Sequence, residues 1–320
     1  MKITDDLLNK NPIYLVDVGA SGGIHERWRK LSSKYVEILF EPDLREFNNL
    51  AKTANSNRII FNTGLGASNR ISQFNLALDQ QKSSVFLPNL ELLGRYPKSD
   101  RYKIQGTVDI SMESCDSLLM KDGFTDCDFL KLDTQGLELE ILNGSKTVLK
   151  KSLGVQVEVE FVELYKGQAS FSDVNLFLIQ NGFELFDLKR FYWKRKNFDY
   201  GVKKGQLIFG DGLYFRSPEF ILSHYKSHPE KLIKAFIVFL VYGYEDIADF
   251  LLSEFKKQCL VSESENSLME KIIKKQKRSF LLPDFKGKGS IRKILLNIAS
   301  LFETNSFYSG TDEIVGNSYD

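Results

Sequence analysis

Residues 13–23 read IYLVDVGASGG, a continuous apolar run that ends in an acid and a glycine-rich turn. An unbroken apolar run of this length predicts a strand that is buried on both faces, as in parallel sheets. Gly19, the first residue after the run, opens a turn in which the missing side chains let a ligand approach the backbone closely. In doubly wound α/β folds, nucleotide-type ligands bind at this turn. The stretch therefore predicts an open α/β sheet with a ligand site at its first turn.

The spacing of the glycines separates two classes of ligand. Dinucleotide-binding folds carry G-x-G-x-x-G and place a pyrophosphate on a helix N-terminus, whereas this chain has Gly19, Gly22 and Gly23. Asp17 would repel a pyrophosphate, but its carboxylate suits the α-amino group of an amino-acid moiety. S-Adenosylmethionine has such an amino group and no phosphate. The alternative is a plain glycine turn in which Asp17 caps the helix.

A second acid, Glu41, ends the next apolar run in the sequence VEILFEPD. An acid at this place in an α/β sheet hydrogen-bonds the ribose hydroxyls of an adenosine ligand. The alternative is a surface glutamate at a strand end, and the same acid would also serve NAD. Together with Asp17 and the glycine spacing, Glu41 favours an adenosine ligand that carries an amino acid.

The order of apolar runs predicts an α/β domain followed by helices. Runs and helical patterns alternate over residues 1–217, which is typical of βαβ units and a mostly parallel sheet with an antiparallel edge. The rhythm breaks over residues 65–112, which predicts an inserted hairpin and a long loop of the kind that often covers a site. Residues 218–320 show helical spacing and no convincing strand. We expect them to form a helical C-terminal extension whose last residues fray.

The expected strands are Ile13–Val18, Val36–Phe40, Arg58–Asn62, Ile71–Leu76, Thr107–Met112, Asp128–Leu132, Gly154–Glu160, Phe183–Leu188 and Leu207–Phe215. The expected helices are Leu44–Thr53, Leu137–Leu142, Phe171–Gln180, Phe220–Ser227, Pro229–Val241, Tyr244–Gln258, Leu268–Arg278 and Ile291–Phe302.

The composition narrows the class of protein. Hydrophobic residues at 42% and charged residues at 27% are typical of a soluble globular chain. The net charge of +1 favours no nucleic-acid partner. Cys115, Cys127 and Cys259 form no C-x-x-C pair, so they predict neither a disulfide framework nor a zinc site, and a reducing compartment fits. The N-terminus lacks a signal-peptide core, and the stretch Leu232–Tyr244 is shorter than the ~20 residues of a membrane span. These features predict a cytoplasmic protein.

Polar residues follow the predicted strand Asp128–Leu132, where DFLKL continues as DTQGLELE. Ligands of open α/β sheets lie beyond the carboxyl ends of the strands. Asp133, Gln135 and Glu138 are therefore candidates for binding an acceptor or for catalysis.

Lys131 lies in the middle of this strand, which is unusual for a lysine in a buried strand. We expect it to pair with a carboxylate, Glu158 or Asp128. The alternative is a lysine that extends to solvent from a sheet edge.

Several motifs of this chain together resemble those of the FkbM family of methyltransferases. They are DVGASGG (17–23), the acid in FEPD (40–43), DFLKLDTQGLELEILNG (128–144), VEVEFVELY (157–165), KSSVF (82–86), SMESCDSLL (111–119) and DGLYFR (211–216). The resemblance covers residues 13–216. It implies a class I, Rossmann-like methyltransferase fold with S-adenosylmethionine as the methyl donor. It also implies acceptor hydroxyls on polyketides, on other secondary metabolites or on the sugars of surface polysaccharides.

The resemblance assigns roles to particular residues. Those at the methionine end of the cofactor would be Asp17, Gly19, Ala20 and Gly22. Glu41 would hold the ribose, and Asp133 would face the transferred methyl group. The backbone near the adenine would be that of Thr63, Gly64 and Leu65. The candidates for binding the acceptor are Ser83, Ser84, Gln135, Glu138, Glu158 and Glu160.

Methyl transfer is an in-line displacement, so the protein mainly holds the acceptor oxygen ~3 Å from the methyl carbon. An alcohol also needs a base that takes its proton. His25 is the first candidate because its ordinary pKa suits the task, although it could equally be an exposed residue at the start of a helix. Asp133 is the second. Many family members carry D-V-E-G where this chain has D-T-Q-G, and the neutral Gln135 cannot act as a base.

Glu158 and Glu160 alternate on one predicted strand and so lie on one face of it. They could bind a hydroxyl-rich acceptor or a divalent ion, and no metal ligand set is assigned from the sequence. The aromatic run Phe191, Tyr192 and Trp193 could stack on sugars, which favours a glycan acceptor, or could simply pack in the core.

The basic segment Lys271–Lys293 is either a solvated helix face or a contact for an anionic glycan, a membrane surface or a partner protein. Two rival functions remain beside the methyltransferase. One is a methyltransferase-like scaffold without activity, which loss of cofactor binding would support. The other is an NAD-dependent sugar oxidoreductase, which Asp17 and the missing G-x-G-x-x-G disfavour.

Overall fold

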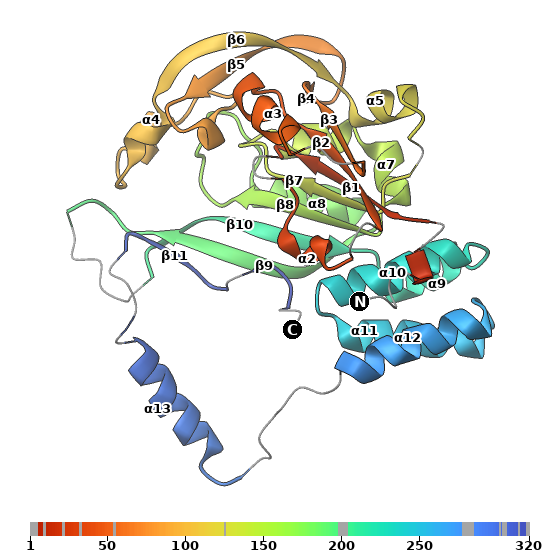
Figure 1. The fold of residues 1–320 in the computed structure, drawn as a ribbon. Coiled ribbons are helices and arrows are strands. Elements are labelled where there is room, and N and C mark those ends of the chain that lie inside the picture. The colour runs from red at the N-terminus through yellow and green to blue at the C-terminus, as the bar shows by residue number, and fades with distance from the viewer. Residues whose placement is uncertain are drawn as a thin grey trace.

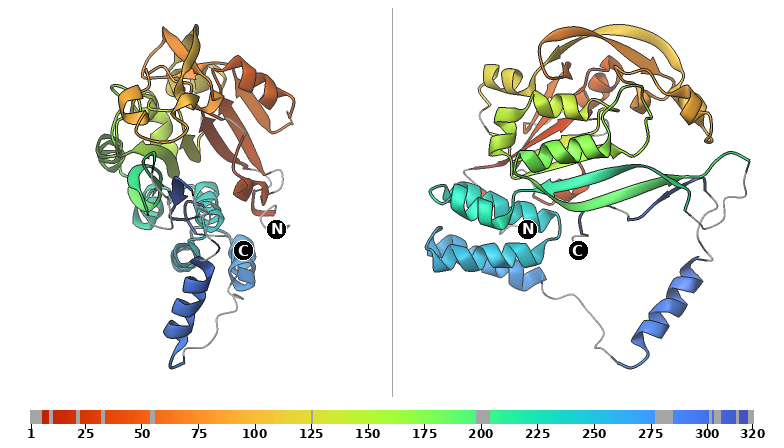
Figure 2. Two further views of the ribbon diagram at one scale, coloured as in Figure 1. Left: turned by 90° about the vertical axis from the view of Figure 1, so that its left-hand side faces the viewer. Right: turned by 180° about the vertical axis from the view of Figure 1, so that it is seen from behind.

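The computed structural model describes residues 6–8, 11–20, 23–31, 34–53, 56–124, 126–197, 204–276, 285–300, 302, 306–312 and 314–317 of the 320-residue chain. A central sheet lies between two layers of helices, and a small second sheet lies at the top of the molecule (Figure 1). Two views from other sides show the same layers edge-on and from behind (Figure 2).

The central sheet is mostly parallel with an antiparallel edge. Its strand order is β11 (Tyr308–Gly310), β9 (Glu184–Trp193), β10 (Gln206–Phe215), β8 (Gly154–Glu160), β7 (Phe129–Leu132), β1 (Ile13–Val18), β2 (Tyr35–Phe40) and β3 (Arg58–Phe61). Strands β8, β7, β1, β2 and β3 run parallel, whereas β10, β9 and β11 pair antiparallel. The predicted α/β class is confirmed. The parallel strands read as apolar runs because helices cover both faces of the sheet.

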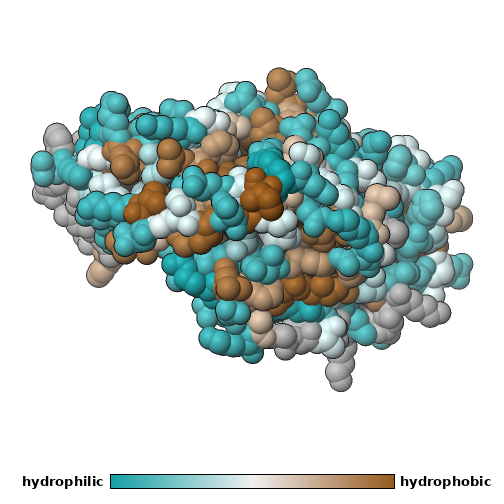
Figure 3. Space-filling model, turned by 90° about the horizontal axis from the view of Figure 1, so that it is seen from above, coloured by the Kyte–Doolittle hydropathy of each residue, from teal (hydrophilic) through white to brown (hydrophobic). Residues whose placement is uncertain are grey.

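The predicted hairpin insertion is also confirmed. The small sheet has the order β4 (Gly64–Leu65), β6 (Ile104–Glu113) and β5 (Arg70–Ala77), and β5 pairs antiparallel with β6. Between these two strands lie the short helices η1 (Gln80–Lys82), α4 (Leu90–Leu93) and η2 (Ser99–Tyr102). From above, this face of the molecule shows apolar patches among hydrophilic side chains (Figure 3).

Helices cover the central sheet on both faces. One face carries α5 (Cys115–Lys121), α6 (Glu138–Asn143), α7 (Lys146–Lys151) and α8 (Phe171–Gln180). The other face carries α2 (Glu26–Arg29), α3 (Leu44–Ala51), α9 (Pro218–His224), α10 (Pro229–Val241), α11 (Glu245–Lys257) and α12 (Glu263–Gln276). The last helix, α13 (Lys288–Ser300), lies apart from both layers (Figures 1 and 2).

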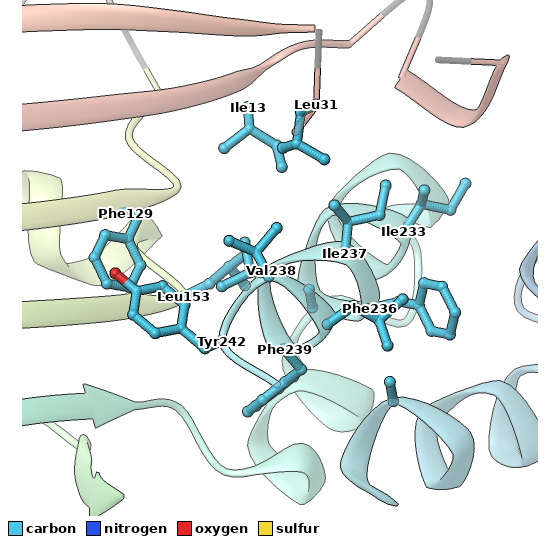
Figure 4. Close-up of a cluster of buried hydrophobic side chains, with 14 of the residues drawn as sticks. Ile13, Leu31, Phe129, Leu153, Ile233, Phe236, Ile237, Val238, Phe239 and Tyr242 are labelled. Atoms are coloured by element: carbon cyan, nitrogen blue, oxygen red, sulfur yellow. The ribbon is translucent and has the colours of Figure 1, made fainter. Parts of the chain in front are cut away.

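Helix α10 packs against the central sheet and joins the C-terminal helices to its hydrophobic core. Its residues from Lys231 to Val241 are all buried, and Figure 4 shows Tyr242, at its end, beside Phe129 while Phe236 points to the opposite side. Tyr242 stacks on Phe129 of β7 with ring centroids 5.0 Å apart, and Phe239 lies 4.8 Å from Phe215 of β10. The predicted apolar helix is thus buried on all sides, and no helix among the described residues is long and apolar enough to cross a membrane.

The expectation of helices alone after residue 218 is wrong at one place. Strand β11 pairs with β9 through Tyr308 and Trp193, so the end of the chain returns to the central sheet. The aromatic side chain of Phe191 stacks on Tyr308, at 5.5 Å between ring centroids. A three-residue strand gives no periodic signal in a sequence, and its partner lies more than a hundred residues upstream.

A buried ion cluster fastens α10 to the sheet. Asp128, which is fully buried, accepts hydrogen bonds from Lys231 Nζ at 2.6 Å and from Lys234 Nζ at 2.8 Å. Its Oδ2 also accepts from the backbone N–H of Tyr14 at 2.8 Å. Asp128 is therefore not the partner of Lys131, contrary to one of the two expectations for that lysine.

Removing the Asp128 charge leaves two buried ammonium groups without their main partner. Asp128→Asn is expected to lower the free energy of unfolding by about 3–5 kcal/mol, the range for breaking a buried ion pair. Urea unfolding followed by circular dichroism measures this loss. Asp126→Asn is the matched control, because Asp126 contacts the same lysines but its side chain is 40% exposed. Equal losses in the two variants would contradict the assignment.

Candidate active site

The turn after β1 is pressed against the end of β7. Gly19 has a φ of +75°, and a Cβ atom built on it would lie 1.9 Å from the carbonyl oxygen of Asp133. Any side chain here would therefore collide with backbone, and the positive φ also requires glycine. The Gly19 N–H donates to Phe40 O at 3.0 Å, and the Asp133 N–H donates to Val18 O at 3.1 Å. Three strand ends thus meet at this turn.

A pocket opens at this meeting point, and we call it the turn pocket. Its empty volume, including space open to solvent, is about 970 Å³. It is lined by Val18, Gly19, Glu41, Pro42, Asp43, Glu46, Thr63, Gly64, Leu65, Phe74, Gln80, Gln81, Lys82, Ser83, Val85, Ile110, Met112, Asp133, Thr134, Gln135, Leu137 and Ile141. The sheet contributes the floor through its carboxyl ends, and the hairpin β5–β6 contributes the apolar wall.

Glu41 is a buried carboxylate in the wall of the turn pocket. Its side chain is only 6% exposed, and Oε1 accepts from the backbone N–H of Asp43 at 2.9 Å. Burial raises the pKa of Glu41 to about 7, and the nearby charge of Asp43 adds to this rise. A carboxylate that faces a pocket and has no ion pair within the described part of the chain suits the two hydroxyls of a ribose.

The turn pocket fits S-adenosylmethionine in shape and chemistry. At Gly64, a Cβ atom would lie 3.0 Å from Ile110 Cδ1, so a side chain there would crowd the apolar wall of the pocket. Glu41 offers acceptors for the ribose, and Leu65 and Ile141 offer an apolar surface for a purine ring.

Asp17 lies beneath the turn pocket and does not line it. It is 1% exposed, and its Oδ1 accepts from Lys131 Nζ at 2.9 Å. Asp17 is therefore the partner of Lys131, and the expected pairing with Glu158 or Asp128 is wrong. The other oxygen of Asp17, Oδ2, is buried without a hydrogen-bond partner among the described residues. Burial raises the pKa of Asp17, and Lys131 offsets part of the rise.

Gln135 lines the turn pocket and hydrogen-bonds to four other side chains. Its Nε2 donates to Asp133 Oδ1 at 3.0 Å and to Glu158 Oε2 at 2.8 Å. Its Oε1 accepts from Lys82 Nζ at 3.2 Å and from Tyr165 OH at 2.9 Å. The residue also has a φ of +57°, which is uncommon outside glycine. A glutamate in this place would add a negative charge between two carboxylates, so the neutral amide suits this position.

A second pocket adjoins the turn pocket and shares Gln81, Lys82 and Gln135 with it. We call it the aromatic pocket. Its lining is Asp79, Gln81, Lys82, Lys98, Arg101, Tyr102, Gln135, Glu158, Leu164, Trp193, Phe209, Ser306, Phe307 and Tyr308. Two donors in its wall, Arg101 Nε and Trp193 Nε1, are buried without an acceptor among the described residues. Buried donors without an acceptor are rare in folded proteins, so these two call for an acceptor that the described residues do not supply.

Three glutamates gather behind the aromatic pocket. Carboxylate oxygens of Glu138, Glu158 and Glu160 all lie within 4.8 Å of one another. Burial raises the pKa of Glu138 to about 7. Burial and the neighbouring carboxylates raise the pKa values of Glu158 and Glu160 well above the ordinary range.

The structure brings most of the predicted cofactor residues together. Those that line the turn pocket are Gly19, Glu41, Thr63, Gly64, Leu65 and Asp133. Ala20 is fully buried beside the pocket, and Gly22 lies outside the described residues.

The predicted acceptor residues divide into two groups. Ser83, Gln135 and Glu158 line one or both pockets. Ser84 instead supports the site, since its Oγ donates to the Gln135 carbonyl at 2.8 Å. Glu138 and Glu160 are each 2% exposed and line neither pocket.

His25 lines neither of the two pockets. It is exposed at the start of α2, where its Nδ1 accepts from the backbone N–H of Arg27 at 3.2 Å. Burial and the charge of Arg27 lower the pKa of His25. The imidazole caps α2 in this structure, and its exposed position agrees with the alternative interpretation of the sequence.

Sequence reasoning missed Lys82, Arg101, Phe307 and Tyr308. Lys82 stands directly before the serine pair in KSSVF, so that motif held the signal. Arg101 lies in the long inserted loop, which we had expected to cover a site without naming residues. The two aromatic residues of the C-terminal segment reach the site only through β11, which no pattern predicts.

Comparisons with known proteins agree with the geometry. The profile of the methyltransferase FkbM domain matches residues 17–185, which is more than half of the chain. The 2-O-methyltransferase NoeI of Sinorhizobium fredii is 26% identical over 179 residues, or 51% of this chain and 69% of NoeI.

Similar solved structures include the precorrin-6y C5,15-methyltransferase of Geobacter metallireducens, at 12% identity and a TM-score of 0.34 over 67% of this chain and 86% of that one. The N-terminal domain of EvdMO1 with SAH bound matches at 7% identity and a TM-score of 0.34, over 67% of this chain and 81% of that one.

The family match confirms the resemblance that the sequence motifs indicated. The enzyme is a methyltransferase with a Rossmann-like fold, and its methyl donor is S-adenosylmethionine. The glycine turn, the second-strand acid and the strand order from β3 to β9 are the features that carry this assignment. The chain belongs to the FkbM family of methyltransferases.

Proposed function

We propose that this enzyme O-methylates a hydroxyl group of a sugar-containing acceptor that binds in the aromatic pocket. The observation that carries the proposal is the pair of buried, unpartnered donors in an aromatic wall, Arg101 Nε and Trp193 Nε1. Sugars present many oxygen acceptors and flat C–H faces, so they match both features. Intermediates of polysaccharide biosynthesis are the acceptors we favour, and the relative NoeI is named a 2-O-methyltransferase.

The arrangement of the aromatic wall supports a sugar. Arg101 lies over the ring of Trp193 at 5.4 Å and over that of Tyr102 at 5.2 Å, which fixes its guanidinium at the pocket edge. Of the predicted aromatic run, Trp193 lines the pocket, whereas Phe191 packs between Phe209 and Tyr308. Trp193 is therefore the member of the run that we propose for stacking.

S-Adenosylmethionine supplies a methyl group on a sulfonium, so the donor is already activated. Asp133 is the residue that we propose as the general base, because it lines the turn pocket and bonds to Gln135, which lines both pockets. One carboxylate oxygen, Oδ1, accepts from Gln135, and this bond orients the group. Asp133 would take the proton of the acceptor hydroxyl as its oxygen attacks the methyl carbon.

Roles in donor binding are proposed for the residues of the turn pocket. Glu41 would accept from both ribose hydroxyls, and the backbone of Thr63, Gly64 and Leu65 would lie near the adenine. Gly19 would admit the methionine end. Asp17 would act on the amino group from beneath, through the free oxygen that the structure leaves without a partner.

We also propose that α13 rests on an anionic membrane surface. Ile291, Leu295 and Ile298 form one stripe along this helix, at 49%, 61% and 49% exposure. The cations of the segment are Lys286, Lys288, Arg292 and Lys293, and residues 285–300 contain no acid. A helix with an apolar stripe and a basic polar face is typical of interfacial helices. Part of the basic segment predicted from the sequence lies outside the described residues.

The free cysteines fit the cytoplasmic location that we propose. Cys115 and Cys127 are buried and unpaired, and Cys259 is exposed as a free thiol. Exposed free thiols persist in reducing compartments.

Donor binding is expected to weaken as the pH falls through 7. Glu41 accepts hydrogen bonds from ribose best when ionised, and its pKa of about 7 makes the ionised form dominant only above that pH. Calorimetric titration with S-adenosylmethionine at pH 6 and pH 8 measures the change. Glu41→Gln should bind weakly at both pH values and lose the dependence. Glu113→Gln, outside the turn pocket, should behave as the wild type, and a pH dependence that persists in Glu41→Gln would contradict the role.

Asp133→Asn is expected to lower turnover by about 10²–10⁴-fold, the usual contribution of a general base. Donor affinity should change little, because the amide keeps the shape of the side chain. Release of S-adenosylhomocysteine from a panel of methyl glycosides and oligosaccharides measures turnover, beside calorimetry of the donor. His25→Ala should keep turnover, since His25 lies outside both pockets. Loss of turnover in His25→Ala with activity in Asp133→Asn would reverse the assignment.

The membrane contact predicts binding to vesicles that contain phosphatidylserine and not to vesicles of phosphatidylcholine alone. Co-sedimentation of the full chain should fall with added salt, because charge drives part of the binding. Leu295→Glu should abolish it by placing a charge in the apolar stripe. Met120→Glu, at an exposed apolar residue of α5, is the control. Equal binding to both vesicles, or a change of oligomeric state in Leu295→Glu, would point to a different contact.

A further inference from the structure

The three glutamates behind the aromatic pocket come from neighbouring elements. Glu138 is the first residue of α6, directly after the turn that follows β7. Glu158 and Glu160 alternate on β8, so both point to the same face of the sheet. The parallel pairing of β7 with β8 brings the turn and the strand together. As a result, one oxygen from each carboxylate lies within 4.8 Å of the other two.

Hydrogen bonds fix two of the three carboxylates in place. Glu138 Oε1 accepts from the N–H and the hydroxyl of Thr134 at 2.7 and 2.9 Å, and Oε2 accepts from the Gly136 N–H at 3.0 Å. Glu158 Oε2 accepts from Gln135 Nε2 at 2.8 Å. These donors are neutral, so they orient the carboxylates without balancing their charge.

Glu160 is the member of the group with an unpartnered oxygen. It is 2% exposed, and its Oε1 is buried with no hydrogen-bond partner among the described residues. The carboxylate that carries this oxygen is a member of the group formed with Glu138 and Glu158. A buried, unpartnered carboxylate oxygen beside two other carboxylates calls for a bound cation or a proton.

The protein itself supplies little positive charge to the group. Among the described residues, no ion pair joins any of the three glutamates to a lysine or arginine. The charge of Lys82 acts on Glu158 and Glu160, but its Nζ donates to the amide oxygen of Gln135. The ligand atoms are all carboxylate oxygens, with no histidine or cysteine among them. Such a set suits a hard divalent ion such as Mg²⁺ or Mn²⁺ and does not suit zinc or copper.

We propose that Glu138, Glu158 and Glu160 form a binding site for one Mg²⁺ or Mn²⁺ ion at the inner edge of the aromatic pocket. Glu158 lines that pocket, so the open coordination positions of the ion would face it. An acceptor with neighbouring hydroxyls could occupy those positions. This last step rests on the proposed function, whereas the cation site does not.

Binding is measured on the full chain after treatment with a chelator and its removal. Calorimetric titration with MnCl₂ and MgCl₂ should show one site per chain, and MnCl₂ should raise the melting temperature. Glu160→Gln should weaken Mn²⁺ binding at least about tenfold, since even residues that only support ligands change metal affinity by 10–100-fold. Glu113→Gln, at a partly buried glutamate paired with Lys121, should bind Mn²⁺ as the wild type does.

Folding of each variant is checked by donor binding, which uses a different pocket. If Glu160→Gln fails this check, Glu158→Gln takes its place, because Glu158 is closer to solvent. Absence of Mn²⁺ binding in a wild-type chain that binds the donor would overturn the inference and leave the group as a cluster that shares protons. Unchanged binding in both glutamine variants would overturn it as well.

Two further outcomes separate this inference from the proposed function. Mn²⁺ binding without methylation of any sugar would keep the cation site and remove the sugar acceptor. Methylation of a sugar that continues in a chelator, with no Mn²⁺ binding, would keep the function and remove the cation site.

Discussion

The contact between Gly19 and the carbonyl of Asp133 is the constraint on which the site depends. A turn without a side chain lets β1 and β7 end at the same level, and the strand ends then form the floor of the turn pocket. Asp133 can face that pocket only because its backbone is held against the turn. The positions of Gln135 and of the group behind it follow from Asp133, since Gln135 bonds both Asp133 and Glu158.

Charge is arranged in layers around this contact. The pair Asp17–Lys131 lies beneath the turn, in contact with the face covered by α10. Above it, carboxylates without cationic partners face the pockets. Glu138 and Glu160 are almost fully buried, and burial of an unpaired acid favours its protonated form or a bound cation. The amide of Gln135 keeps the acids apart without adding to their charge, which is why an amide is suited to this position.

Local patterns predicted the fold well because they record burial directly. IYLVDV and GVQVEVE are apolar on the faces that helices cover, and Pro229–Val241 matches α10 at both ends. The glycine spacing and Glu41 predicted the turn pocket, because Gly19 and Glu41 directly follow predicted strands and line the pocket at those strand ends. Residues that act through distant contacts were not predictable. Lys131 of β7 pairs with Asp17 on the adjacent strand β1, far away in the sequence. Tyr308 reaches the aromatic pocket through β11, a strand of three residues.

The return of β11 to the sheet has a consequence for the order in which the site is made. All residues of the turn pocket lie before residue 142, so a ribosome has produced them early in synthesis. The wall of the aromatic pocket needs Phe307 and Tyr308, which emerge last. Domains fold as they leave the ribosome, N-terminal parts first. A nascent chain could therefore complete the first pocket while the second still stood open, and only a chain made through residue 310 would have both.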